Sequence, residues 1–262
     1  SYKLYTSDMS FASQRRGSYL FGFILLLLIV VGIPAYLYFY TPPTCTDGLQ
    51  NGMEEGIDCG GDCPIICSFK AVDPTIHWSR VFQVVPGLYT VVAFVENPNL
   101  AYETDNLLYT FKLRDTSGVL VYEQKGNLYL PSRYNLPVFA TGIRTGERIP
   151  ARVDFEFLQP PVWTEAETEW KSGIEIVERR LMNEDTVPRL VATIRNTTLY
   201  DITDMPLVAT LYDSDENAVH ASRTVVDILP ASGEMEIVFT WPEPVARPVA
   251  QIDIVAVPTE PR

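Results

Sequence analysis

An uninterrupted apolar run near the N-terminus constrains this chain more than any other feature. The run from Tyr19 to Tyr40 has the sequence YLFGFILLLLIVVGIPAYLYFY and contains no charged residue. At about 1.5 Å of rise per helical residue, it is long enough to cross a hydrocarbon core of about 30 Å. A helix inside a soluble domain is seldom apolar on every side over such a length. The run therefore predicts a transmembrane helix over residues 19–40.

The residues that flank the run predict its orientation. Arg15 and Arg16 precede it, and Lys and Arg next to a membrane helix favour the cytoplasmic side. We therefore expect residues 1–18 to form a short cytoplasmic tail and everything from residue 41 onward to lie outside the cytoplasm, with the lipid bilayer as a partner. A cleaved signal peptide is the alternative, but its apolar core spans about 7–15 residues and ends in small residues. This run is longer and is followed by two prolines, which favours a single-pass anchor in the cell membrane.

The composition favours an acidic, folded protein that does not bind nucleic acid. The chain carries 33 acidic and 20 basic residues, which gives a formal net charge of −13. Binding to a phosphate backbone requires a basic face that displaces counterions, and the sequence contains no such basic cluster. Twenty prolines among 262 residues favour many short elements, because proline disrupts helix interiors and central strands.

All four cysteines lie in one short segment directly after the predicted helix. This segment, residues 41–68, has too few apolar residues to fold by burial alone, and two disulfides outside the cytoplasm would explain how it becomes ordered. Four cysteines allow three pairings, and the spacing does not select one. A zinc site is the alternative, but such sites usually contain two C-x2–4-C pairs, whereas these residues form one cluster and a distant fourth member. The predicted disulfide cysteines are Cys45, Cys59, Cys63 and Cys67.

The same segment is rich in glycine and in side chains that carry oxygen. Oxygen ligands on a glycine-rich loop suit a hard cation such as Ca²⁺, but the spacing does not match a D-x-[DN]-x-[DN]-G loop. The alternative is turn chemistry, in which Asp and Asn bond to nearby backbone groups and Gly adopts positive φ. We expect turn chemistry with no metal and no cofactor, and the calcium alternative stays open. The residues concerned are Asp47, Asn51, Glu54, Asp58 and Asp62.

From Phe69 to the C-terminus, short alternating apolar runs are separated by Gly, Pro and Asn clusters. This pattern predicts an all-β fold of two tandem β-sandwiches, preceded by the transmembrane helix and the small disulfide-rich module. We expect the first sandwich at 69–163, a linker at 164–172 and the second sandwich at 173–262. The predicted strands span 89–97, 107–115, 118–124, 151–157, 189–196, 206–213, 218–226, 235–241 and 250–257.

The two stretches repeat one pattern. Asn97 follows a strand, and the next strand ends at Asp115, 18 residues later. Asn196 follows a strand, and the next strand ends at Asp213, 17 residues later. Each Asp is followed by a turn and another apolar strand. Such doubling predicts two similar sandwiches, each able to bury its own core.

The repeated pattern resembles the FxLYD-type immunoglobulin-like domain, and the cysteine segment resembles a DCGG-type module of surface proteins. The complete order, including ERIPARVDFEF from Glu147 to Phe157, resembles an uncharacterised family of membrane-anchored envelope proteins. The resemblance implies that both sandwiches are immunoglobulin-like and that the chain functions in the cell envelope, and it implies no activity. The domain resemblance depends on Asn196, Leu211, Tyr212, Asp213, Leu229 and Pro230, and in the first copy on Leu113, Asp115, Leu130 and Pro131, with Arg114 in place of the tyrosine.

No motif typical of an enzyme is present in the sequence. His77 and His220 are the only histidines, and no G-x-S-x-G elbow precedes them. The phosphate-binding motifs G-x-x-x-x-G-K-[ST] and G-x-G-x-x-G are also absent. We therefore expect no catalytic residue and no small-molecule substrate. Asn196 begins a glycosylation sequon, which is used only in a host with that machinery.

These observations predict a non-enzymatic, membrane-anchored, extracytoplasmic structural or interaction protein of the cell envelope, with a protein partner there. Sandwich domains in series commonly act as spacers and docking surfaces. One alternative is a ligand-binding or adhesion receptor ectodomain. Another is an accessory subunit of a membrane complex.

Overall fold

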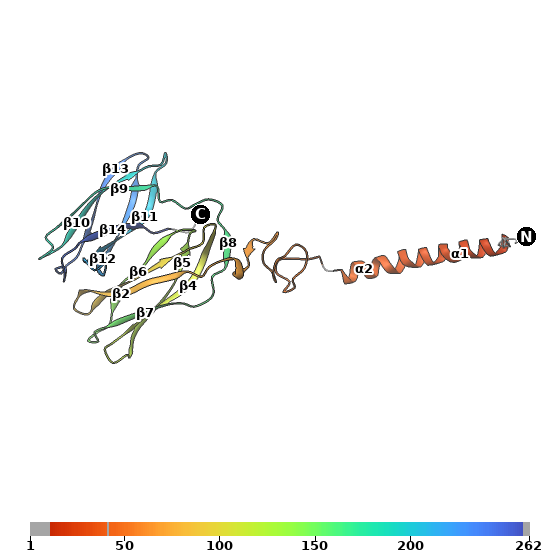
Figure 1. Cartoon of the computed structure of the whole chain (residues 1–262), viewed down its shortest axis with the longest axis horizontal. Coiled ribbons are helices and arrows are strands. Elements are labelled where there is room, and N and C mark those ends of the chain that lie inside the picture. The colour runs from red at the N-terminus through yellow and green to blue at the C-terminus, as the bar shows by residue number, and fades with distance from the viewer. Residues whose placement is uncertain (1–10, 41, 259–262) are drawn as a thin grey trace, which may run out of the picture.

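The computed structural model describes residues 11–40 and 42–258, which form a helix, a small loop-rich module and a β-sheet head (Figure 1). The predicted all-β fold class with one preceding helix is confirmed, because the regular elements after the helix are strands apart from one short 3₁₀ turn. The strands are β1 (Ile65–Ile66), β2 (Thr75–Val85), β3 (Leu88–Glu96), β4 (Tyr102–Arg114), β5 (Leu120–Leu130), β6 (Asn135–Arg144), β7 (Arg152–Phe157), β8 (Trp163–Glu165), β9 (Ile174–Met182), β10 (Arg189–Asn196), β11 (Ile202–Tyr212), β12 (Ala218–Leu229), β13 (Glu234–Thr240) and β14 (Gln251–Ala256).

One continuous helical segment projects from the rest of the molecule (Figure 1). It comprises α1 (Phe11–Leu27), a π-helical turn (Leu28–Gly32) and α2 (Ile33–Phe39). Pro34 explains the π-helical turn, because proline lacks an N–H and its ring crowds the carbonyl one turn earlier. The stretch Arg15–Phe39 has the length and composition of a membrane span or a signal sequence, and none of it is buried against the described part of the chain.

The helix extends further toward the N-terminus than the apolar run. It begins at Phe11, so residues 11–18 of the predicted tail are helical. Residues 1–10 of that tail lie outside the described residues. The helix continues through Arg15 and Arg16 because nothing in that stretch breaks it, and its apolar part alone has the sequence signature of a membrane span.

The cysteine-rich module is attached to the head by hydrogen bonds as well as by the chain. Its strand β1 pairs with β8, and β8 pairs in turn with the start of β4. The Asn99 side chain accepts a hydrogen bond from the Val72 N–H at 2.7 Å and donates one to the Val72 carbonyl at 2.8 Å. The module is therefore fixed to the first sandwich.

The head consists of two sandwiches with the same strand arrangement. In each, the first, second and fifth strands form one antiparallel sheet, and the third, fourth and sixth form the other. The first sandwich has β2-β3-β6 opposite β5-β4-β7, and the second has β9-β10-β13 opposite β12-β11-β14. Buried side chains from both sheets fill each core, for example Val91 with Phe111 and Ile194 with Leu211. The predicted duplication thus appears as a repeated topology.

All of the predicted strands overlap observed ones, but the short strands β1 and β8 and the three longer strands β2, β6 and β9 were missed. Pro137 and Gly142 interrupt the pattern of β6, and charged residues dominate β9. Bulges in β2 shift the side-chain alternation at both of its ends. These interruptions are tolerated because all three strands lie at sheet edges, where a missing or irregular hydrogen bond costs less.

The segment between the sandwiches also differs from a free linker. The predicted linker at 164–172 begins inside β8, where Thr164 pairs with both Ile65 and Glu103. Trp163 in the same strand is buried. Residues 259–262, at the end of the second predicted domain, lie outside the described residues.

The two sandwiches pack side by side and form one head (Figure 1). Phe82 and Val92 of the first sandwich form a buried cluster with Tyr212, Ala218 and Ala221 of the second. We call this boundary the seam. Because its central side chains are buried and apolar, it holds the sandwiches in a defined relation.

Candidate functional site

The module contains the two predicted disulfides. Cys45 is bonded to Cys63, and Cys59 is bonded to Cys67. The structure thus selects one of the three pairings that the spacing had left open, and it excludes the alternative of a four-cysteine zinc site. The bonds cross in sequence, since Cys59 lies between Cys45 and Cys63, and they enclose most of the module.

The oxygen-bearing side chains of the module bond mainly to its own turns. The Asp47 carboxylate accepts hydrogen bonds from the backbone N–H of Leu49 at 2.9 Å and from the Asn51 side chain at 2.9 Å. The Asn51 amide is the main cause of the lowered pKa of Asp47. Asp58 accepts from the backbone N–H of Gly48 at 3.0 Å. These bonds match the predicted turn chemistry.

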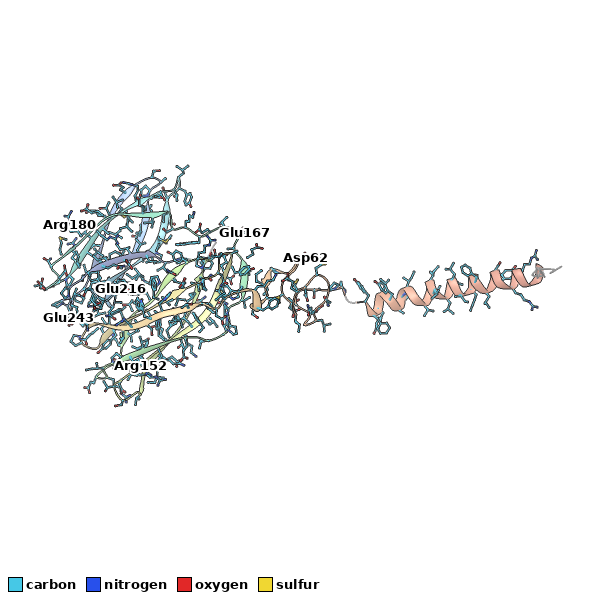
Figure 2. The ribbon with its side chains drawn as sticks, viewed as in Figure 1. Asp62, Arg152, Glu167, Arg180, Glu216 and Glu243 are labelled. Carbon is cyan, nitrogen blue, oxygen red and sulfur yellow. A yellow bond between two sulfur atoms is a disulfide. The ribbon has the colours of Figure 1, made fainter. Side chains whose placement is uncertain are left out.

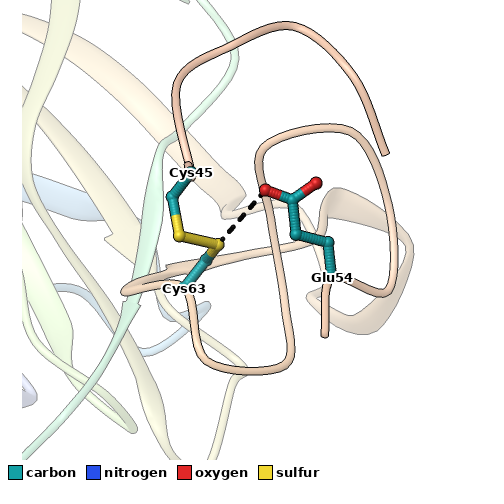
Figure 3. Close-up of side chains that lie close together, drawn as sticks. All are labelled: Cys45, Glu54 and Cys63. Atoms are coloured by element: carbon teal, nitrogen blue, oxygen red, sulfur yellow. Dashed lines mark hydrogen bonds between the residues drawn. A yellow bond between two sulfur atoms is a disulfide. The ribbon is translucent and has the colours of Figure 1, made fainter. Parts of the chain in front are cut away.

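One group in the module resembles a metal site in its arrangement. Ligand atoms of Cys45, Glu54 and Cys63 lie within 4.8 Å of one another (Figure 3). The two sulfur atoms are joined in a disulfide, and metal binding requires free thiolates. The Glu54 carboxylate is then the single ordinary ligand of the group, so the cluster does not have the chemistry of a metal site.

The two histidines lie in different surroundings. The exposed His77 has its Nε2 2.7 Å from a carboxylate oxygen of Glu96. His220 is buried at the seam, with its ring stacked against Phe82 at a centroid distance of 5.9 Å. Burial lowers the pKa of His220. His77 therefore lies in an exposed contact with a carboxylate, and His220 lies in a packed interface.

Asn196, the first residue of the sequon, is a structural residue in the folded chain. Its side chain is buried, and its Nδ2 donates to the carbonyls of Tyr200 at 2.7 Å, Leu229 at 3.1 Å and Pro230 at 3.1 Å. A glycan would attach to that same nitrogen. The folded chain therefore leaves no room for glycosylation at Asn196.

A groove with a volume of about 690 Å³ lies along the seam. Its walls are residues 78–82 of β2, 151–153 at the start of β7, 217–219 at the start of β12 and 246–247 in the loop before β14. We call it the seam groove. It combines segments that are far apart in the sequence, and it exists because the two sandwiches pack side by side.

Among the residues that the structure describes, the seam groove is lined by three arginines and by no carboxylate side chain. Arg152 pairs with Asp154 at 3.0 Å behind the lining. Arg247 pairs at 2.7 Å with the buried carboxylate of Asp213, and this guanidinium is the main cause of the lowered pKa of Asp213. Arg80 lies between the sandwiches, and its Nη2 donates to the Asn217 side chain at 2.9 Å. In a chain with a net charge of −13, the groove is locally basic.

Among the described residues, Arg80 has no carboxylate within ion-pair distance of 4.0 Å. Its charge is therefore balanced less well than those of Arg152 and Arg247. Sequence analysis did not single out any of these three residues as a site. The available signal was one cation in an otherwise apolar stretch, WSRVF at 78–82, but the sequence does not show that this stretch faces a second sandwich.

Comparisons with known proteins add little to this description. No protein-family model matches the chain, and no curated protein matches it. Among solved structures, red sea bream transglutaminase has a TM-score of 0.25 and 9% identity over 71% of this chain and 29% of that one. A β-glucuronidase from glycoside hydrolase family 2 has a TM-score of 0.23 and 10% identity over 83% of this chain and 29% of that one.

The chain thus spans about a third of the length of these two proteins, and similarity at this level supports no conclusion about fold or activity. The class that the structure itself defines is an all-β protein with an apolar N-terminal helix. A disulfide-tied module joins that helix to a head of two packed sandwiches.

Proposed function

We propose that this protein is a non-enzymatic, membrane-anchored interaction protein of the cell envelope, with its head outside the cytoplasm. The observation that carries the proposal is the apolar stretch Arg15–Phe39, no part of which is buried against the rest of the described chain. Exposing that much apolar surface to water is unfavourable, whereas a bilayer accepts it.

Two further features support an outward-facing head. Arg15 and Arg16 at the N-terminal end of the apolar stretch favour the cytoplasmic side. The two disulfides beyond its other end persist best in an oxidising compartment. The charge rule and the redox chemistry thus favour the same orientation.

The two sandwiches and the groove between them favour a role for the head in binding a partner. Each sandwich has a complete core, and we propose that both are immunoglobulin-like, in line with the resemblance of the repeated Asn and Asp positions. The seam groove favours the ligand-binding alternative over a pure spacer, because it is a basic cleft on an acidic protein.

A labelling experiment on intact cells tests the orientation. The full chain with a C-terminal tag is treated with a membrane-impermeant amine reagent, and we expect labelling of head lysines before lysis. We also expect the chain to stay in the membrane after alkaline carbonate extraction and to keep the mass of the uncleaved helix. Labelling that appears only after lysis, or a chain that lacks the helix, would contradict the proposal.

Charge reversal at the helix end makes the test sharper. The double variant Arg15→Glu, Arg16→Glu is expected to give a mixed orientation, seen as a fraction of chains that resist labelling, because the cytoplasmic signal is lost. The matched control is Lys171→Glu, Arg180→Glu, which makes the same charge change in the head. This control should keep the uniform orientation of the original chain.

A further inference from the structure

The floor of the seam groove is the free edge of β2. Among the described strands, β2 forms backbone pairing with β3 alone, so its other edge has no hydrogen-bonded strand, although β7 of the opposite sheet lies close to β2. Ser79 and Val81 face the first sandwich, where Ser79 Oγ donates to the Val153 carbonyl at 2.9 Å. Arg80 and Phe82 face the second sandwich. The consecutive residues 78–82 all line the groove, although their side chains point alternately to the two faces of β2. The groove therefore runs along the edge of the strand.

Along this edge of β2, backbone N–H and C=O groups at alternate residues have no described strand to pair with. Pairing between β2 and β3 is continuous from Trp78 to Gln83, between a bulge near Ile76 and another near Val85. Among the described residues, the only backbone partners of residues 78–82 are those in β3. Alternate residues of an antiparallel edge strand direct their N–H and C=O groups outward. A straight stretch of donors and acceptors therefore faces the groove.

The second sandwich provides an internal comparison, because β9 occupies the position equivalent to β2. Strand β9 carries Glu175, Glu178, Arg179 and Arg180, and charged residues are a common protection of sheet edges against pairing. The Arg179 side chain also donates to the Ile252 carbonyl of β14. In β2, the regular stretch carries one formal charge, at Arg80. The edge of β2 thus lacks the protection that its counterpart has.

The charges around the edge indicate what would pair with it. Arg80 and Arg247 come from the seam side of the groove, and Arg152 comes from the β7 side. Side chains of an added strand point alternately to its two faces. Acidic side chains on such a strand would therefore meet arginines on both walls, and this arrangement favours an acidic strand over a neutral one.

We propose that the seam groove binds an extended acidic segment of another polypeptide, which adds to the free edge of β2 as an extra antiparallel or parallel strand. Backbone hydrogen bonds to residues 78–82 supply the pairing. Arg80, which has no ion-pair partner among the described residues, supplies most of the selection for acidic side chains, and the ion-paired Arg152 and Arg247 add to it. This inference deepens the proposed function by naming its binding surface and the chemistry of the partner.

The test uses the full chain in detergent, so its outcome does not depend on membrane orientation. The probe is a fluorescein-labelled peptide of alternating glutamate and valine, about eight residues long, which matches a typical strand. We expect saturable binding by fluorescence anisotropy, and slower amide exchange in residues 78–82 when the peptide is bound. The peptide with lysine in place of glutamate should not bind.

Two variants separate the groove from the general surface. Arg80→Gln is expected to weaken binding about tenfold, because its charge lacks another partner. Arg152→Gln, which leaves the seam intact, should weaken binding to a smaller extent. The control is Arg180→Gln on the equivalent edge β9, which should bind like the original chain; Arg152 and Arg180 lie on different sandwiches (Figure 2). Urea unfolding confirms that each variant is folded.

Several results would overturn the inference. A peptide with N-methylated backbone amides on the edge facing β2 cannot pair as a strand, and equal binding of this peptide would show attraction by charge alone. Polygalacturonate that binds the groove while the acidic peptide does not would indicate an anionic polysaccharide as the ligand. A dimer that Arg152→Gln disrupts would indicate a second copy of this chain. Loss of membrane anchoring with peptide binding intact would refute the proposed function and not the groove.

Discussion

Asn97 and Asn196 occupy equivalent positions in the two sandwiches and form the same kind of hydrogen bonds there. Each side chain is buried, and each Nδ2 donates to the carbonyls at the end of the fourth strand of its sandwich, Leu130 and Pro131 in the first and Leu229 and Pro230 in the second. A single amide thus links two strand ends that would otherwise leave buried carbonyls unpaired. Sequence reasoning found both residues as repeat markers, but only the structure shows why asparagine is required.

Replacing Asn196 with alanine should destabilise the second sandwich. The change leaves buried carbonyls without a donor, and we expect the free energy of unfolding to fall by about 3 kcal/mol. Urea denaturation followed by tryptophan fluorescence measures the loss. Asn127→Ala is the control, since Asn127 is exposed and its replacement should change stability by less than about 0.5 kcal/mol. Equal stability of the two variants would refute this role.

At the scale of elements, the cysteine-rich module depends on covalent bonds where the sandwiches depend on burial. Cys67 is one of its few fully buried side chains, and exposed apolar residues such as Leu49 and Met53 occupy its surface. A segment of this size without a sizeable apolar core relies on disulfides for order. The module and the sandwiches should therefore respond differently to reduction.

Reduction should unfold the module and leave the sandwiches folded. Each disulfide is expected to contribute about 2–4 kcal/mol to the order of the module. Hydrogen exchange after treatment with a reductant should become fast across residues 44–67 and stay slow in β4 and β11. A calcium chelator should change neither region. A chelator effect on the module would instead support the calcium alternative.

At the scale of the whole molecule, His220 is buried in the seam, where we expect its protonation to affect folding. This residue packs between Phe82 and Trp241, at ring distances of 5.9 Å and 6.0 Å. It lines a seam cavity of about 220 Å³ together with the cation of Arg223, and no carboxylate within residues 11–40 and 42–258 lines that cavity. Burial lowers its pKa below the ordinary value of 6.5, so the unfolded chain takes up the proton at a higher pH than the folded chain.

The stability from neutral His220 is therefore fully present above pH 6.5 and is lost as the pH falls toward the lowered value in the folded chain. We expect the urea midpoint at pH 5.5 to lie below that at pH 7.5, and His220→Phe to reduce this difference. The variant Asn127→Ala, which replaces an exposed side chain that does not titrate, should retain the difference of the original chain. A His220→Phe variant with an unchanged pH dependence would show that other groups cause it.

The sequence alone determined the features that depend on local pattern. The apolar run predicted a helix, alternation predicted most strands, and spacing from Asn97 to Asp115 and from Asn196 to Asp213 predicted a duplicated fold. Turn chemistry at Asp47 and the presence of disulfides followed from composition. Each of these depends on neighbours within one segment, so the pattern of residues is sufficient.

The tertiary structure alone decided the disulfide pairing, the short strands β1 and β8, the edge strands β2, β6 and β9, and the seam groove. Edge strands tolerate proline, charge and bulges, so their sequences lack the regular alternation that identifies central strands. The groove depends on how two sandwiches pack together, which brings Arg80, Arg152 and Arg247 to one place from separate parts of the chain. No local pattern encodes that packing, because it is set by the complementarity of two complete surfaces.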